Sequence, residues 1–204
     1  MDEIGLFPLG IVLLPTERVP LHIFEPRYRE LVAECLEDDA EFGVVYADEE
    51  GVREVGTRAR VTEVLERFDD GRLNIVVEGT ERFRVEQVTR GRTFMTAMVI
   101  PVDDDGTEAD DDVAARAMDA FRALAALAGA EDAEADVGSP QLSYELAGQV
   151  ELPADAKQEL LESRSEGERL ERVVELLDGA RRLLIAAREL GDRAKQNGSR
   201  SPSS

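Results

Sequence analysis

His22 and Cys35 are the chain's only histidine and only cysteine, so they are the first candidates for catalytic chemistry. A histidine can act as a general base only with a nucleophile or a substrate within hydrogen-bond reach. His22 lies on a proline-flanked segment of strand-like alternation, which favours a hydrogen-bonded structural role. Cys35 lies beside Val32 and Leu36 on the apolar face of a predicted helix, where burial disfavours the reactive thiolate. We therefore interpret Cys35 as an inert, buried thiol.

Carboxylate clusters suggest metal chemistry next, at Asp103–Asp105 and Asp110–Asp112. One histidine and one cysteine do not supply the ligand set of a zinc site. A calcium loop of the EF-hand type needs acids at positions one, three and five before its glycine, and counting back from Gly106 places Pro101 at position one. We interpret both runs as solvated loops, with weak cation association left open. The sequence predicts no catalytic residue, no metal ligand and no cofactor.

Composition restricts the class of protein. The 204 residues are 43% hydrophobic, which is enough for a sizeable core, and they contain no apolar run long enough to cross a bilayer. The start, Met1-Asp2-Glu3, lacks the pattern of a signal peptide, so we expect a cytoplasmic protein. The net charge is −21, and residues 100–137 hold twelve acids but only two bases. A polyanion repels phosphate backbones, which disfavours nucleic acid as a partner.

The first half of the chain has the pattern of short β-strands. Val19, Leu21 and Ile23 alternate with other residues at the period of a strand, and Asp70-Gly71 is a hairpin turn signal. Strands at this density favour a small barrel or a sandwich. The expected extended segments are Ile11–Leu14, Val19–Phe24, Phe42–Ala47, Glu54–Phe68, Leu73–Glu78, Phe83–Val85 and Phe94–Val102.

One helix interrupts these strands. Pro26 suits a first helical position, because no N–H is needed there. The apolar residues that follow have the spacing of one buried helix face, and charged residues cover the other face. The predicted buried residues are Tyr28, Leu31, Val32, Cys35 and Leu36.

The composition changes after Pro101, and helical patterns follow an acidic segment that we expect to be a flexible junction. Helices are predicted at Val113–Ala128, from a Ser139 cap with Pro140 next to it, and at Ala154–Glu162. Ser165 and Glu168 form a capping box before a last helix that ends at Gly191. Its apolar stripe, predicted to pack within a bundle, is Val173, Leu176, Ala180, Leu183, Ala187 and Leu190. The expected units are 1–102, 103–191 and a disordered, serine-rich tail, 192–204.

Several segments together resemble the substrate-binding domain at the N-terminus of the Lon protease. They are LFPLGIVLLP (Leu6–Pro15), VPLHIFEPRYRELV (Val19–Val32), VGTRARVTEV (Val55–Val64), IVVEGTERFRV (Ile75–Val85) and LSYELAGQVELPADAKQELLE (Leu142–Glu162). Their order and spacing extend the resemblance over about residues 4–190. The resemblance implies an α+β fold, in which a PUA-like β-barrel is followed by a helical bundle.

The chain departs from Lon protease in one respect: no G-x-x-x-x-G-K-[ST] phosphate loop occurs in it. The resemblance therefore implies a stand-alone, non-enzymatic module that binds exposed or unfolded polypeptide, with a protease or a chaperone as a further partner class. We predict Phe24, Tyr28, His22 and Arg27 as the peptide-binding residues, in a groove between barrel and bundle. Phe24 and Tyr28 have a core interpretation as well. A PUA-like nucleic-acid binder and a hydrolase of unrecognised type are the alternatives.

Overall fold

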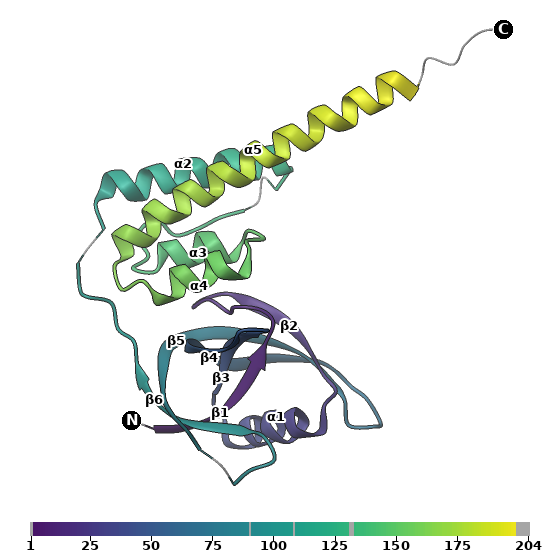
Figure 1. Ribbon diagram of the computed structural model, residues 1–204, viewed down its shortest axis with the longest axis vertical. Coiled ribbons are helices and arrows are strands. Elements are labelled where there is room, and N and C mark those ends of the chain that lie inside the picture. Colours follow the sequence, from purple (N-terminus) through teal and green to yellow (C-terminus); the bar gives the residue numbers. More distant parts are fainter. Residues whose placement is uncertain (1, 90, 108, 131–132, 199–204) are drawn as a thin grey trace, which may run out of the picture.

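Six strands make one sheet whose pairings close into a ring. A computed structural model describes residues 2–89, 91–107, 109–130 and 133–198 (Figure 1). The strands run in the order β2-β5-β4-β3-β1-β6, and β5 also pairs with β6, so the ring β5-β4-β3-β1-β6 returns to β5. We call these six strands the closed sheet. Their bounds are β1 (Asp2–Leu9), β2 (Arg18–Ile23), β3 (Phe42–Asp48), β4 (Gly51–Arg67), β5 (Leu73–Thr89) and β6 (Met95–Pro101).

The long strand β5 makes this closure possible. Its first part, Leu73–Glu78, pairs with β2, and its second part, Phe83–Thr89, pairs with β6. Strand β4 pairs antiparallel with β5 on both sides of that division. The sequence predicted two separate segments here, and the structure joins them into one strand. The first part of β5 pairs with β2 and β4 but not with β6, so these paired segments lie outside the ring. We call them the hairpin arm.

Helix α1 (Pro26–Asp38) covers one end of the closed sheet. Pro26 begins it as predicted, and Tyr28, Leu31, Val32 and Cys35 are buried on a single face, with Leu36 partly buried. This face packs in the same core cluster as Phe7 and Phe42 of the sheet. The predicted helix and its buried face are therefore confirmed.

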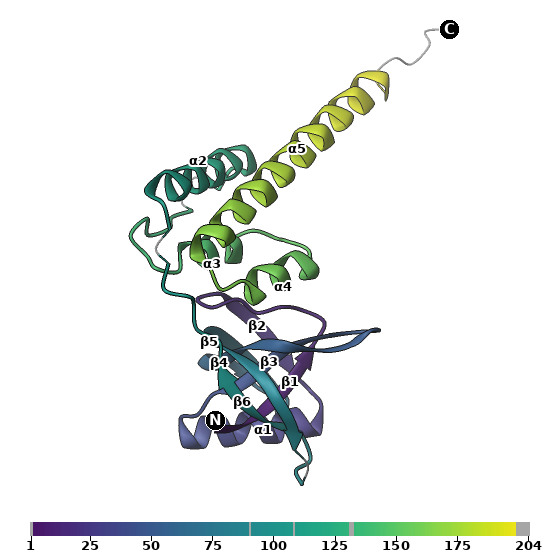
Figure 2. The same ribbon diagram turned by 60° about the vertical axis from the view of Figure 1, so that its left-hand side comes forward.

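Four helices follow at the opposite end of the sheet from α1 (Figures 1 and 2). They are α2 (Asp111–Ala128), α3 (Leu142–Gly148), α4 (Ala154–Glu162) and α5 (Glu166–Gly198). We call them the helical half. Phe121, Leu146, Leu160 and Leu177 lie in its core. Strands followed by helices give the mixed α+β class that the sequence predicted.

The first strand is not where the apolar run suggested. Strand β1 ends at Leu9, and the run Ile11–Leu14 has no regular structure. Ile11 is exposed, and the other three residues are buried because they lie between two cores: Val12 and Leu14 belong to the core of the helical half, whereas Leu13 belongs to the core of the sheet. A segment buried between two layers is as apolar as a buried strand, although it makes no ladder of hydrogen bonds with a neighbouring strand.

Hydrogen bonds hold this connection against the sheet. The Thr57 hydroxyl donates to the Leu13 carbonyl oxygen at 2.6 Å, and the Thr16 and Gly79 amides donate to Gly79 and Glu17 at 2.8 and 2.9 Å. A Cβ on Gly79 would lie 2.1 Å from the Leu14 carbonyl oxygen, so a glycine is required at this approach.

Two helix ends differ from their predictions. Helix α3 begins at Leu142, so Ser139 is not its cap; its hydroxyl accepts instead from the Gln141 amide in the preceding turn, at 3.2 Å. The predicted cap of α5 is correct, because the Ser165 hydroxyl accepts from the Glu168 amide at 3.3 Å.

Helix α5 is longer and less covered than its stripe predicted. It continues past Gly191 to Gly198, so residues 192–198 are helical, whereas the rest of the predicted tail, 199–204, lies outside the described residues. Among its described residues the buried apolar side chains are Leu170, Val173 and Leu177, while Leu183 is 74% exposed. The stripe therefore packs only along its first part. Leu184, next to Leu183, still packs against the core of the helical half, so the packed face has left the predicted stripe by that point, and α5 then extends beyond α2 (Figure 2).

We expect Leu31→Ala to lower the free energy of unfolding by about 2–5 kcal/mol, because it removes a side chain that is buried between α1 and the sheet. Glu34→Ala is the control on the exposed face of the same helix, and its effect should stay below about 1 kcal/mol, because the Glu34–Arg92 ion pair is solvent-exposed. Denaturant unfolding measures both, and equal effects would contradict the orientation of α1.

Candidate polypeptide-binding surface

Two of the predicted site residues lie together on the outer surface. Phe24, directly after β2, is 59% exposed, and its ring stacks on that of His22, with centroids 5.9 Å apart and planes 19° apart. Phe68, at the β4–β5 turn, approaches His22 edge-on at 6.0 Å and 83°. We call His22, Phe24 and Phe68 the aromatic cluster. It presents apolar rings to solvent on the hairpin arm.

The cluster is held by a row of polar side chains across three strands. His22 is opposite Asn74 in the β2–β5 register, and its Nδ1 lies 2.6 Å from Asn74 Oδ1. The Asn74 amide nitrogen donates to Glu66 on β4 at 3.0 Å, which assigns the oxygen of Asn74 to the His22 side. Since that oxygen only accepts, Nδ1 carries the proton. In the neutral ring Nε2 is then an acceptor for a ligand N–H.

A shallow groove adjoins the cluster, between α1 and the β4–β5 turn. Its volume is about 480 Å³, and Phe68 belongs to both the groove and the cluster. The guanidinium of Arg72 lies 4.9 Å from the Phe68 ring centroid, and Arg29 donates to the Asp70 carbonyl oxygen across the groove. The lining residues are Pro26, Arg29, Glu30, Ala33, Arg67, Phe68, Gly71 and Leu73. Apolar walls with charged rims suit a peptide segment of mixed composition.

Tyr28 and Arg27, the other two predicted residues, are not in this groove's lining. Tyr28 is buried and stacks on Phe7, with ring centroids 4.0 Å apart. Burial raises the pKa of the Tyr28 hydroxyl, and the nearby Arg27 charge opposes that effect. The Arg27 guanidinium covers the Tyr28 ring at 4.5 Å and pairs with Glu25 at 2.9 Å. For Tyr28 the core interpretation is therefore the correct one.

The predicted location between barrel and bundle is wrong. Tyr28 lies in α1 and Phe24 lies two residues before it, and α1 is at the end of the closed sheet that faces away from α2–α5 (Figure 1). The reason is the direction of β2: it begins next to the helical half, where Glu17 pairs with Lys157, and leads away from it. Phe68 was not predicted. Its position just before the Asp70-Gly71 turn was visible, but its proximity to His22 depends on strand register.

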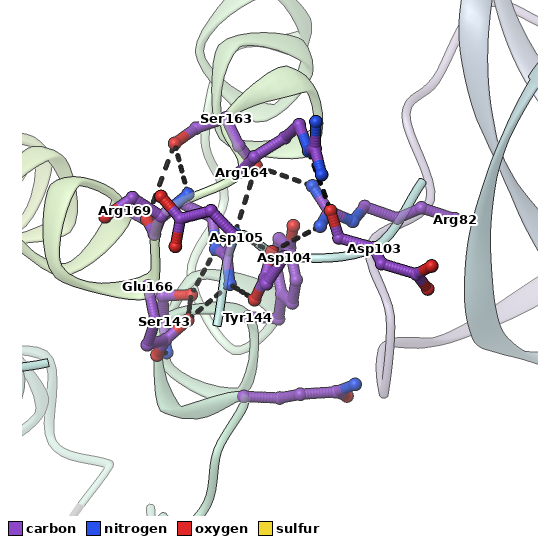
Figure 3. Close-up of polar contacts among 12 residues, drawn as sticks. Arg82, Asp103, Asp104, Asp105, Ser143, Tyr144, Ser163, Arg164, Glu166 and Arg169 are labelled. Atoms are coloured by element: carbon purple, nitrogen blue, oxygen red, sulfur yellow. Dashed lines mark hydrogen bonds and ion pairs between the residues drawn. The ribbon is translucent and has the colours of Figure 1, made fainter. Parts of the chain in front are cut away.

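At the junction itself the structure places a network of charges. Asp104 accepts from Arg82 of β5 and from Arg169 of α5, whose Nη1 lies 2.7 Å from Asp104 Oδ1 (Figure 3). Arg169 is fully buried and also pairs with Glu166 at 2.6 Å, while Arg82 donates to the Leu161 carbonyl oxygen at 2.9 Å. The run Asp103–Asp105 was expected to be a solvated loop. Asp104 instead joins the sheet to the helices.

Ser143 completes this network without the features of a nucleophile. Its hydroxyl donates to Glu166 at 2.7 Å and accepts from Arg169 Nε at 3.0 Å, and the residue is fully buried. A buried hydroxyl that is already engaged in two hydrogen bonds cannot reach a substrate and attack it. The Tyr144 ring lies 4.5 Å below the Arg169 guanidinium, and burial raises the pKa of Tyr144 to about 12. The network therefore has a structural role.

Cys35 is also without the features of a nucleophile. Burial, with a smaller effect of the Glu34 and Asp38 charges, raises the pKa of its thiol to about 11, so the thiolate is scarce at neutral pH. Among the described residues no group of three or more histidine, cysteine or acidic side chains is placed to hold a metal ion. Within the same residues, no helix combines the length and apolar character needed to cross a membrane.

Comparison with known proteins agrees with this architecture. The family model of the ATP-dependent protease La (LON) substrate-binding domain matches residues 3–179. The chain belongs to this family. The resemblance seen in its sequence motifs is thus confirmed.

The relatives of this LON domain are proteases of much greater length. The Lon protease of Brevibacillus choshinensis is 24% identical over 211 residues, which are 95% of this chain and 27% of that protein. The Lon protease of Anaeromyxobacter dehalogenans is 26% identical over 201 residues, or 90% of this chain and 24% of that protein. The chain spans about a quarter of the length of these relatives.

Solved structures match the LON domain along most of its length. The Lon N-terminal domain protein from Xanthomonas campestris superposes with a TM-score of 0.67 at 27% identity, covering 86% of this chain and 98% of that one. The N-terminal domain of a Mycobacterium avium complex Lon protease superposes with a TM-score of 0.68 at 19% identity, covering 87% and 98%. The second likeness shows the fold alone.

The Asp104 network generates a prediction about acid stability. Burial would raise the pKa of Asp104, but hydrogen bonds and charges, first of Arg169 and then of Arg82, outweigh it and hold the pKa below its usual 3.8. Because the folded-state pKa is the lower one, the ion pairs stabilise the fold above about pH 4, and this contribution is lost as the pH falls through the folded-state pKa.

We therefore expect Asp104→Asn to cost about 3 kcal/mol at pH 7, the lower end for a broken buried pair, because Asp104 itself is 33% exposed. The difference from wild type should shrink below about pH 4, where the wild-type carboxylate is protonated too. Asp103→Asn is the matched control and should change little, since Asp103 contributes only its carbonyl oxygen, to Arg164. A difference that is constant with pH would contradict this role of Asp104.

Cys35 gives a second prediction. In the native state it should react with a thiol reagent at pH 8 far more slowly than in denaturant, because the thiol is buried and its pKa is raised to about 11. Absorbance during labelling measures both rates. Equal rates would show that the α1–sheet core opens easily.

Proposed function

We propose that this LON domain binds exposed segments of polypeptide non-covalently, through the aromatic cluster and the adjoining groove. The observation that carries the proposal is the exposure of Phe24 within an organised set of rings. Burying an aromatic ring is favourable by about 25 cal/mol per Å² of apolar surface, so rings held outward provide a binding surface. The match to a substrate-binding family, and relatives that are Lon proteases, support polypeptide as the ligand.

The fold favours docking in the groove over addition of a strand. Among the described strands, β2 pairs only with β5, which leaves one β2 edge free. Pro20 lies in the middle of β2 and has no N–H to donate, and proline is a common way to block a sheet edge. A peptide would therefore gain its affinity from side chains on the rings and from the groove.

Charge sets the expected preference among ligands. The chain carries −21 overall, so basic segments with apolar residues should bind better than acidic ones. Added salt should weaken that preference, because it screens charges beyond about 8 Å at physiological ionic strength.

We also propose that this LON domain is non-enzymatic and that its closed sheet is a PUA-like barrel. The Ser143 hydroxyl is engaged in two hydrogen bonds and Cys35 is buried, so we infer a binding module without hydrolytic activity. The ring of pairings that returns to β5 supports the assignment of the closed sheet as a PUA-like barrel.

Phe24→Ala should weaken binding to denatured polypeptide about tenfold from a micromolar dissociation constant, because truncating an aromatic anchor typically costs more than 1 kcal/mol. The matched control is Val88→Ala on β5, which removes an apolar side chain of similar exposure, 52%, outside the cluster. Fluorescence anisotropy with labelled, unfolded peptides measures both affinities. Tyr28→Ala is unsuitable, because removing a buried ring would cost about 3–5 kcal/mol of stability.

Two results would contradict the proposed polypeptide binding. One is equal binding by wild type, Phe24→Ala and Val88→Ala. The other is no binding to peptides at any salt concentration together with binding to RNA at low salt, which would favour the nucleic-acid alternative. Measurable ATP turnover or peptide cleavage by the purified chain would contradict its non-enzymatic part.

A further inference from the structure

A second groove lies in the helical half, far from the aromatic cluster. Its volume is about 420 Å³, and its walls come from α2, from the segments after α2 and after α3, and from α5. Ala180 and Leu184 form the α5 wall. The remaining lining residues are Phe121, Leu124, Ala125, Ala128, Ala130, Ala133, Gln149, Val150 and Glu151. The walls are almost entirely apolar.

The segments that form this groove are strongly acidic. From Ala123 to Ala156 the sequence contains seven acidic residues and no lysine or arginine. Glu134 and Glu151 are both exposed, and Glu151 lines the groove itself. The Gln149 side chain donates to the Glu134 carbonyl oxygen at 2.8 Å, which places Glu134 at the same rim. An occupant of this groove should therefore be apolar along one face and basic at its edges.

The exposed part of α5 has this composition. Leu183 and Leu190 are 74% and 64% exposed, and Ala187 between them is exposed too. We call these three residues the α5 stripe. Between positions 180 and 190 the helix carries three arginines and one glutamate, in a chain whose net charge is −21. The stripe continues the apolar surface of the groove along α5, because Ala180, Leu183, Leu184 and Ala187 have the spacing of one helix face.

We propose that two copies of this chain pair about a two-fold axis, with the α5 stripe of each copy in the groove of the other. Figures 1 and 2 show that α5 extends beyond the rest of the helical half, so a second copy can reach the stripe. The basic segment of α5 then meets the acidic rim of its partner. Because of the two-fold axis, the stripe–groove contact occurs twice in the pair. The two contacts together bury about twice the surface of one, which strengthens the pairing.

Reversing charges tests this arrangement. One variant carries Glu134→Arg and Glu151→Arg at the groove, and the other carries Arg181→Glu and Arg182→Glu on α5. Each variant alone opposes like charges at both contacts, and its dissociation constant should rise about tenfold or more. Mixed one to one, the two variants form opposite charges at both contacts, so a mixed pair should form with an affinity near that of wild type. Sedimentation velocity measures all three samples.

An apolar variant provides the control. Leu183→Glu should make the chain monomeric, because it places a charge in the centre of the contact, whereas Val88→Glu, at an exposed position on the sheet, should leave pairing unchanged. Circular dichroism checks the fold of every variant, all of which change exposed residues. We expect wild-type pairing with a dissociation constant on the order of micromolar, so protein that stays monomeric at about 100 µM would overturn the proposal. Pairing that survives either charge reversal would overturn it as well.

Discussion

The shared carboxylate of Asp104 is the interaction on which the arrangement of this molecule depends. Arg169 is fully buried on α5, and an unpaired charge at that depth would cost several kcal/mol. Asp104 and Glu166 neutralise it, and Asp104 also binds Arg82 of the closed sheet. A residue near the start of the acidic segment thus joins the two parts of the chain. These ion pairs can hold the two parts together because most of their members are shielded from water, so that salt screens them little.

The connection between β1 and β2 complements this fastening with apolar contact. Val12 and Leu14 enter the core of the helical half, and Leu13 enters that of the sheet, so a few consecutive residues belong to both layers. Glu17 accepts from the Leu14 amide at 3.0 Å and pairs with Lys157 on α4. Both connections lie at the junction. The α1 end of the sheet and the exposed part of α5 take no part in these connections, and they carry the two surfaces that we propose for binding.

Local patterns were sufficient to predict α1, the β4–β5 hairpin and the helices after Pro101. These elements obey periods of 3.6 or 2 and have Pro26, Asp70-Gly71 or Ser165 at their ends. Errors arose where tertiary structure decides. Val12, Leu13 and Leu14 are apolar because they lie between two cores, and Leu183 is exposed because the packed face of α5 follows Leu177, Ala180 and Leu184 instead. The pairing of His22 with Phe68, and of Asp104 with Arg169, joins residues that are distant in sequence, and no local signal records such proximity.

The positions of the aromatic cluster and the α5 stripe have a consequence for the strength of the proposed polypeptide binding. The aromatic cluster lies at the α1 end of the molecule and α5 extends from the other end (Figure 1). Because the Asp104 network fixes the halves to one another, a contact made through α5 leaves the rings uncovered. A pair of copies joined through α5 would carry two aromatic clusters on one assembly. A single unfolded polypeptide long enough to reach both would then bind the second cluster intramolecularly, and weak affinity at each cluster would become firm retention of the chain. On this proposal, modest exposure of a few rings would be enough to bind an unfolded chain, without the large apolar patch that would make a free protein aggregate.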